Sequence, residues 1–279
     1  MKSSPLLAAG AVQSRNSPLT QLHPLSAMPT LFSLLVFTFA CFVAFPLSAQ
    51  ERPQEREPAV QKESKLPPAL TEYHGRRIAP AMSYLGADWL VRATREKEER
   101  CSLMLANLGV TRGMTVCDMG CGNGFYALQM AKMAGAEGHV YAVDIQPEML
   151  KLLNERMDEQ EIRNITPIMG SLTDPRLPAG KIDLILCVDV YHEFSHPEHM
   201  LRAMRAALSP KGLVVLVEFR AEDPNVPIKA EHKMSKEQVL KELGPNGFEL
   251  AKEFDKLPWQ HMLFFRKGKE KEGGVGSGQ

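Results

Sequence analysis

Short apolar segments alternate with amphipathic helical segments through most of the chain, and this alternation constrains its fold more than any other feature. Segments of strand length occur at Met114–Asp118, His139–Val143, Ile165–Met169, Ile182–Val188 and Leu213–Phe219. Apolar strands separated by helices predict a parallel sheet that helices cover on both faces. We therefore predict an α/β fold with a doubly wound sheet, whose ligands bind beyond the carboxyl ends of the strands.

Helical patterns fill the intervals between these strands. The charged run Arg95–Arg100 predicts the solvated face of a helix over Ala87–Leu108. Ser235 and Gln238 form a capping box, which predicts that a helix begins there. Further helices are predicted at Phe125–Met133, Pro147–Gln160 and Pro197–Leu208, and two final strands at Phe248–Phe254 and His261–Phe265.

A glycine-rich loop follows the first of the strands. Asp118, Gly120, Gly122 and Gly124 have the spacing D-x-G-x-G-x-G directly between a strand and a helix. Glycines allow a tight turn there and let the backbone approach a ligand without a Cβ in the way. Asp144 follows about 20 residues later at the end of the next strand, where a carboxylate can accept both hydroxyls of a ribose.

Two nucleotide cofactors fit this loop. The order Gly122-x-Gly124-x-x-Ala127 also satisfies the G-x-G-x-x-A fingerprint of dinucleotide-binding enzymes, so an NAD(P)-dependent oxidoreductase is an alternative. Asp118 at the strand end would repel a pyrophosphate, whereas it would attract a cationic ammonium group. The chain also shows one nucleotide-binding unit and no evident second half.

The whole pattern resembles the class I S-adenosylmethionine-dependent methyltransferase family. The resemblance rests on Asp118–Gly124, Asp144, Ile182–Glu193 and Leu213–Phe219, and it extends over about residues 87–266. It implies a Rossmann-like sheet of seven strands, mostly parallel with one antiparallel strand. It also implies S-adenosylmethionine as the cofactor and a small molecule as the methyl acceptor.

The resemblance further implies which residues hold the cofactor. Asp118 would lie near the ammonium group of its methionine part, Asp144 would hold the ribose hydroxyls, and Ile145 would pack on the adenine. Asp189 would lie at the end of the fourth strand, where a backbone carbonyl of the family contacts the ammonium group. The rest of the cofactor set is Gly120, Gly122 and Gly124 at the methionine and ribose, with Ser171 and Leu172 at the adenine end.

The segment after the fourth strand contains the candidate catalytic residues. Methyl transfer requires an aligned nucleophile and the exclusion of water, and a general base helps when the nucleophile carries a proton. His192 is the candidate base, Glu193 the candidate residue that orients it, and Tyr191 a candidate for shaping the pocket or facing the sulfonium. The alternative is that these side chains only fill the loop. The resemblance also implies that Tyr73–Leu90 forms a lid over the substrate.

Composition excludes several other classes. Lys and Arg together number 33, as do Asp and Glu, so the chain lacks the basic excess of a nucleic-acid-binding protein. Cys117 and Cys121 have no second Cys or His pair at the spacing of a zinc site, so no metal is predicted. A non-catalytic, cofactor-binding interaction module stays open as a further alternative.

The two ends of the chain are predicted to lie outside this domain. Residues 1–49 include the apolar run Leu31–Leu47, which ends near Pro46 and small residues, and this is typical of a secretory signal peptide. Export is therefore expected, with a retained membrane anchor as the alternative, because the run reaches the lower limit of about 17 residues for a spanning helix. We predict a linker at 50–72, the methyltransferase domain at 73–266 and a disordered tail at 267–279.

Overall fold

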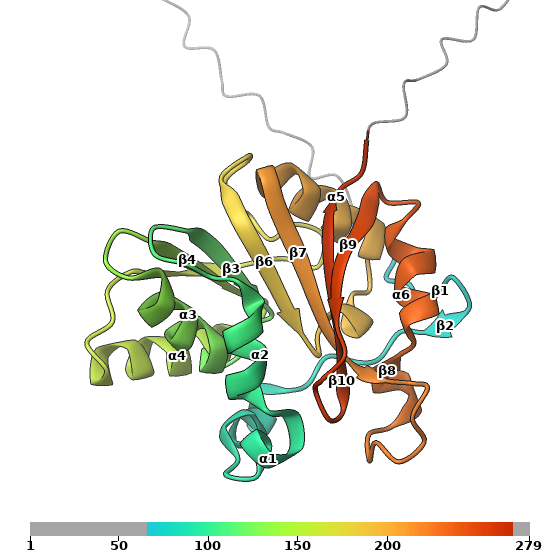
Figure 1. Ribbon diagram of the computed structural model, residues 1–279, viewed down its shortest axis with the longest axis horizontal. Helices are drawn as coiled ribbons and strands as arrows, with labels where there is room; N and C mark the ends of the chain where they lie inside the picture. Colours follow the sequence, from blue (N-terminus) through green and yellow to red (C-terminus); the bar gives the residue numbers. More distant parts are fainter. Residues whose placement is uncertain (1–65, 270–279) are drawn as a thin grey trace, which may run out of the picture. The chain divides into compact units, whose positions relative to one another are not determined.

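A central sheet organises the molecule, which is known from a computed structural model that describes residues 66–269. Seven of its eight strands follow the order β5-β4-β3-β6-β7-β10-β9, and the eighth, β8, pairs with β7 (Figure 1). The strands are β3 (Thr115–Met119), β4 (His139–Asp144), β5 (Ile165–Met169), β6 (Ile182–Val188), β7 (Leu208–Arg220), β8 (Lys233–Met234), β9 (Phe248–Phe254) and β10 (Gln260–Lys267).

Strand directions confirm the predicted fold class. The strands β3, β4, β5, β6 and β7 pair in parallel, whereas β10 runs antiparallel to both β7 and β9. The sheet is thus mostly parallel with one antiparallel strand, as expected. The two-residue strand β8 is an addition to the predicted seven strands, and it pairs in parallel with the end of β7.

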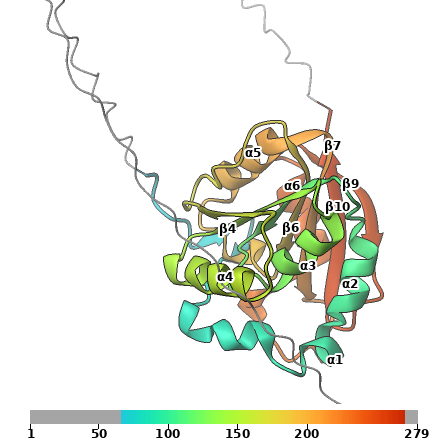
Figure 2. The same cartoon turned by 90° about the vertical axis from the view of Figure 1, so that its left-hand side faces the viewer.

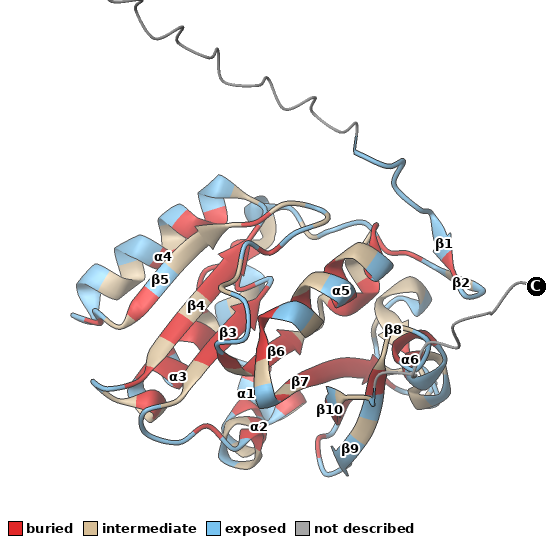
Figure 3. Ribbon diagram, turned by 90° about the horizontal axis from the view of Figure 1, so that it is seen from above, coloured by how far each residue is buried: buried red, intermediate tan, exposed pale blue. Residues whose placement is uncertain are grey.

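Helices cover both faces of the sheet, and Figure 2 shows α5 on one side of the strands and α3 and α4 on the other. Figure 3 shows buried residues along β6 and β7 and exposed residues on the outer side of α4, as expected for helices that bury one face. One core contains residues of α2 (Cys101–Leu108), α3 (Phe125–Ala134) and α4 (Pro147–Glu159), and the other contains residues of α5 (Pro197–Ala207) and α6 (Lys236–Leu243).

The serine half of the predicted capping box is present at the start of α6. Ser235 is the residue before the helix, and its Oγ accepts a hydrogen bond from the backbone N–H of Gln238 at 3.0 Å. This bond satisfies one of the backbone donors that the first turn of a helix leaves without a partner. The local prediction was sufficient here because both residues belong to the same turn.

The prediction of a single helix over Ala87–Leu108 is wrong. The segment divides into the 3₁₀ helix η1 (Tyr84–Val91), the short helix α1 (Arg95–Glu99) and α2. Arg100 separates the last two with a left-handed backbone, φ 53°. The charged run is also not uniformly solvated, because Arg95 and Glu99 are buried.

Residues 66–269 also contain the short hairpin of β1 (Glu72–Tyr73) and β2 (Arg76–Arg77). In that stretch of chain, no helix is both long and apolar enough to cross a membrane. The predicted signal peptide or anchor at 1–49 lies outside the described residues, as do most of the predicted linker and most of the tail.

Candidate active site

A cavity of about 570 Å³ lies at the carboxyl ends of β3, β4 and β6. Gly120 directly follows β3, Asp144 ends β4 and Val188 ends β6, and all three line its wall. Doubly wound sheets bind their ligands at this edge. The cavity therefore lies at the edge of the sheet where the sequence predicts a ligand site.

The glycine loop forms one wall of the cavity. Gly120 and Gly122 have φ values of 67° and 53°, a conformation that side chains disfavour. A Cβ on Gly120 would lie 2.3 Å from Cγ2 of Val190, and one on Gly122 would lie 2.6 Å from Cδ1 of Leu90. Gly124 instead packs against α4, because a Cβ there would lie 2.3 Å from Cδ1 of Leu153. Gly124 thus belongs to the packing behind the cavity rather than to its wall.

The carboxylate of Asp144 is fixed beside this loop. Its Oδ2 accepts a hydrogen bond from the backbone N–H of Gly122 at 2.9 Å, and its Oδ1 accepts one from that of Gln146 at 2.9 Å. Burial nevertheless raises the pKa of Asp144. Each carboxylate oxygen can accept two hydrogen bonds, so both retain capacity for a ligand.

Asp118 occupies a different position from the one predicted. Its side chain is buried behind the loop and does not line the cavity. Its Oδ2 has no hydrogen-bond partner among residues 66–269, and burial raises its pKa to about 7. The predicted contact between Asp118 and a ligand's ammonium group is therefore not supported by this position.

Asp189 does line the cavity, immediately after β6. Its Oδ2 accepts a hydrogen bond from Nε2 of Gln260 at 2.8 Å, while its buried Oδ1 has no partner in the described part of the chain. Burial and the nearby Glu99 and Glu218 carboxylates raise the pKa of Asp189 well above its usual range. A buried carboxyl oxygen without a partner costs free energy, and a cationic ligand group beside it would offset that cost.

The residues predicted at the adenine end do not line the cavity. Ile145 and Leu172 are exposed, and Ser171 accepts a hydrogen bond from the backbone N–H of Asp174 within its own turn. Gln146, next to Ile145, does line the cavity. The loop after β5 therefore closes on itself, and Ser171 and Leu172 do not line the cavity.

The segment expected to form a lid, Tyr73–Leu90, contributes to the wall of the cavity. Met82, Trp89 and Leu90 line the cavity. The backbone N–H of Met82 donates to Oε1 of Glu193 at 3.2 Å, and its carbonyl accepts from Nε2 of Gln146 at 2.9 Å. These bonds connect the lid to two residues of the cavity wall.

Sequence reasoning missed an ion pair in the wall. Nε of Arg95 donates to Oε2 of Glu99 at 2.8 Å, and Nη2 of Arg92 donates to Oε1 of the same carboxylate at 2.5 Å. Nη1 of Arg95 also donates to the carbonyl of Leu90 at 2.7 Å, which holds the lid. The i,i+4 spacing of Arg95 and Glu99 was the available signal.

His192 lies in the wall and is oriented by a residue other than the one predicted. Its Nδ1 lies 2.6 Å from Oε2 of Glu218, and its Nε2 lies 3.1 Å from Nδ1 of His232. Burial lowers the pKa of His192, but the charge and hydrogen bond of Glu218 outweigh this effect, so the pKa is raised. Glu218 is the one acid in the otherwise apolar core of β7 (Leu213–Phe219), which was the signal for a buried pair.

Glu193 therefore does not orient His192, but it has a place of its own in the wall. It lies beside His192 and binds the lid through the N–H of Met82. Burial raises its pKa to about 7. His232, which ends the short 3₁₀ helix η3 (Ala230–His232), was not predicted from the sequence.

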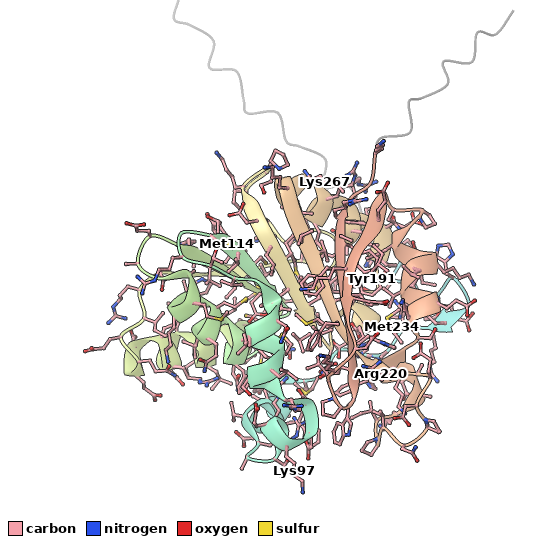
Figure 4. The ribbon with its side chains drawn as sticks, in the orientation of Figure 1. Lys97, Met114, Tyr191, Arg220, Met234 and Lys267 are labelled. Atoms are coloured by element: carbon pink, nitrogen blue, oxygen red, sulfur yellow. The ribbon has the colours of Figure 1, made fainter. Side chains whose placement is uncertain are left out.

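Tyr191 does not line the cavity, so its predicted role in shaping the pocket is wrong. The residue is fully buried, and its hydroxyl donates to Oε2 of Glu242 on α6 at 2.8 Å. Figure 4 shows Tyr191 between the sheet and α6. Arg76 pairs with the same Glu242 at 2.6 Å and lies 5.5 Å from the centre of the Tyr191 ring. Tyr191 is therefore part of the packing between α6 and the sheet.

Comparisons with known proteins agree with this geometry. Residues 110–267 match the family described as a methyltransferase domain. A demethylmenaquinone methyltransferase of Listeria welshimeri is 28% identical over 118 residues, which are 42% of this chain and 49% of that protein. The ubiquinone/menaquinone biosynthesis C-methyltransferase UbiE of Idiomarina loihiensis is 30% identical over 112 residues, which are 40% of this chain and 45% of that protein. The chain thus spans about half the length of these curated relatives.

A solved structure shares the fold. The S-adenosylmethionine-dependent methyltransferase of Aquifex aeolicus superposes with a TM-score of 0.63 at 23% identity, covering 66% of this chain and 98% of that one. The family match spans more than half of this chain and contains the glycine loop, Asp144 and His192. It decides between the two enzyme classes that the glycine loop left open: the chain belongs to the methyltransferase domain family.

Proposed function

We propose that this protein transfers a methyl group from S-adenosylmethionine to a small-molecule acceptor. The observation that carries the proposal is the carboxylate of Asp144, which the amides of Gly122 and Gln146 hold at the cavity wall. A fixed carboxylate at the end of the second parallel strand is the group that accepts ribose hydroxyls in nucleotide-binding sheets. The family match supports the same transfer chemistry.

The cavity fits S-adenosylmethionine better than a dinucleotide. Gly120 and Gly122 line the cavity and carry no side chain, so a ligand can approach their backbone closely. Oδ1 of Asp189, buried and unpartnered in the described residues, suits a cationic ammonium group. A dinucleotide offers no ammonium group for that oxygen, and its pyrophosphate would lie beside the acidic side chains of Asp144, Asp189 and Glu193 in the same cavity.

The residues of the chain have separable tasks in this reaction. S-adenosylmethionine, when bound, supplies an electrophilic methyl carbon on a sulfonium. Asp144 and the glycine loop orient the cofactor, and the lid excludes water, which matters because an aligned, dry pair of reactants supplies much of the rate. We assign activation of the acceptor to His192 and Glu193, which line the cavity side by side.

The wall also favours an acceptor with an apolar part. Met82, Trp89, Leu90, Phe219 and Ile228 line the cavity. Apolar walls with a few polar groups are typical of small-molecule sites. One curated relative is named a demethylmenaquinone methyltransferase and the other a ubiquinone/menaquinone biosynthesis C-methyltransferase. These names support an apolar ring compound as the first acceptor class to test.

Calorimetric titration of the full-length protein with S-adenosylhomocysteine and with NADH tests the cofactor. We expect S-adenosylhomocysteine to bind and NADH not to bind. Incubation of a metabolite extract with methyl-labelled S-adenosylmethionine then identifies the acceptor. Binding of NADH alone would reject the proposal, and binding of S-adenosylhomocysteine with no labelled product in any extract would favour a non-catalytic cofactor-binding module.

A further inference from the structure

Three side chains with metal-binding atoms converge in the cavity wall. Nε2 of His192 lies 3.1 Å from Nδ1 of His232, and the ligand atoms of these two residues and of Glu193 all lie within 4.8 Å of one another. All three residues line the cavity. Two imidazoles and one carboxylate are a donor set that first-row divalent cations bind.

The distance between the two ring nitrogens is the distance expected for two ligands of one ion. Zinc–nitrogen bonds measure about 2.0–2.1 Å, so nitrogens that subtend an angle between 90° and the tetrahedral value are roughly 2.9–3.4 Å apart. The nitrogens of His192 and His232 fall within this interval at 3.1 Å. The spacing of the two nitrogens therefore suits one shared cation, which binds once the rings turn so that both lone pairs point at it.

Glu218 orients the imidazole of His192 for binding a metal ion. Its Oε2 lies 2.6 Å from Nδ1 of His192 and accepts that nitrogen's proton in a hydrogen bond, while its Oε1 accepts from the backbone N–H of Tyr191 at 3.0 Å. A histidine that donates its other ring N–H to a carboxylate presents a lone pair to a metal in a fixed direction. In the neutral imidazole, this arrangement leaves the lone pair on Nε2.

The charges around His192 and the backbone pairing next to His232 also favour a cation at this position. Glu218 is buried and Glu193 half-buried, so two carboxylates adjoin His192 with limited access to water. A dication would balance both charges. His232 is also held in place, because the next residue, Lys233, pairs in β8 with Phe219 of β7.

We propose that His192, Glu193 and His232 bind a divalent transition-metal cation of the zinc type. Three protein ligands leave a coordination position that faces the cavity. If the proposed methyl transfer is correct, that position takes an oxygen or nitrogen atom of the acceptor and lowers the pKa of the acceptor group. His192 then acts as a metal ligand rather than as the general base.

Metal titration tests the site independently of turnover. The full-length protein, freed of metal with a chelator, is titrated with Co²⁺, whose visible absorption reports its coordination, and Zn²⁺ is then added as competitor. We expect one Co²⁺ per chain and its displacement by Zn²⁺. His232→Ala and Glu193→Gln should each lower Co²⁺ affinity at least about 10-fold, because each removes one of three ligands.

His199→Ala is the matched control, because it removes an imidazole from α5 that does not line the cavity. It should leave Co²⁺ affinity unchanged. Titration of each variant with S-adenosylhomocysteine reports whether the fold and the cofactor site are intact, so failure of the metal site is distinct from failure of the proposed function. The absence of a Co²⁺ spectrum in the parent protein, or unchanged affinity in His232→Ala, would show that the two histidines form only a hydrogen-bonded pair.

Discussion

Oε2 of Glu218 lies 2.6 Å from Nδ1 of His192, and both side chains are buried. The contact joins β7 to the 3₁₀ helix η2 (Tyr191–Glu193) at the cavity. Because Glu218 also accepts the backbone N–H of Tyr191, its carboxylate is fixed by two donors. The imidazole is therefore oriented before any ligand binds, which is what a group that acts on the acceptor requires.

Glu218→Gln should impair the reaction although it preserves the shape of the side chain. In this variant, the side-chain amide at position 218 satisfies both neighbours when its oxygen accepts from the N–H of Tyr191. Its NH₂ group then donates to Nδ1 of His192. This reverses the imidazole tautomer and places the hydrogen on Nε2, which no longer presents a lone pair to the cavity. We expect turnover to fall at least about 10-fold with S-adenosylhomocysteine affinity unchanged.

Glu222→Gln is the control for that variant. Glu222 also pairs with a histidine, since its Oε2 lies 2.8 Å from Nε2 of His261, but it does not line the cavity. Steady-state kinetics of both variants should show the loss in Glu218→Gln alone. An equal loss in both would mean that general destabilisation, not the orientation of His192, is the cause.

Asp144→Asn should weaken cofactor binding. Asparagine has one acceptor oxygen, so one of the backbone N–H groups of Gly122 and Gln146 would face an NH₂ group, and the acceptor for a ribose hydroxyl would be lost. We expect the S-adenosylhomocysteine affinity to fall by about 10- to 100-fold, measured by calorimetry. Asp158→Asn on the exposed side of α4 should bind as the parent does, and equal affinities for the two variants would remove Asp144 from the cofactor site.

Gly120→Ala should destabilise the fold through a steric clash as well as backbone strain. Gly120 and Gly180 have nearly equal φ values, 67° and 68°, but a Cβ on Gly180 meets nothing within 4 Å, whereas one on Gly120 lies 2.3 Å from Val190. Gly180→Ala therefore measures backbone strain alone, about 1–2 kcal/mol. Urea denaturation should show an additional loss of about 1–3 kcal/mol in Gly120→Ala. Similar losses would mean that Val190 moves aside without cost.

Tyr191→Phe should lower stability and leave turnover intact. The hydroxyl donates to Glu242, and this carboxylate keeps its ion pair with Arg76 when the hydroxyl is removed. We expect a loss of about 1 kcal/mol in the free energy of unfolding, the usual contribution of one hydrogen bond. Kinetic constants within a factor of two of the parent would agree with a packing role, whereas a large fall in turnover would restore Tyr191 to the reaction.

The features that the sequence predicted well are local. The strands Ile165–Met169, Ile182–Val188 and Phe248–Phe254 begin and end at the residues that the sequence predicted. The glycine loop was recognisable because a backbone with positive φ at Gly120 and Gly122 admits few other residues. Asp144 followed from the same logic, because the end of a parallel strand fixes its place at the sheet edge.

The features that it missed depend on contacts between distant segments. Glu218 follows His192 after a whole helix and most of β7, so only the pairing of β6 with β7 brings the two together. His232 reaches the cavity because β8 pairs with β7, and a two-residue strand has no periodicity to detect. Asp118 has the motif spacing, yet its side chain turns behind the loop, and spacing alone does not determine that direction.

Asp118→Asn should stabilise the ligand-free protein at neutral pH but not in acid. Burial raises the pKa of Asp118 to about 7 in the folded chain, whereas an unfolded Asp titrates near 3.9. Between these values the folded chain binds a proton that the unfolded chain lacks, so the free energy of unfolding of the parent falls as pH rises. Asparagine carries no charge, so the variant escapes this loss, and its advantage grows from about pH 4 to pH 7 towards an upper limit of about 4 kcal/mol. Urea denaturation at pH 5 and pH 8 measures this advantage, with the exposed Asp158→Asn as control; an advantage that is the same at both pH values would show that Asp118 is already ionised in the folded chain.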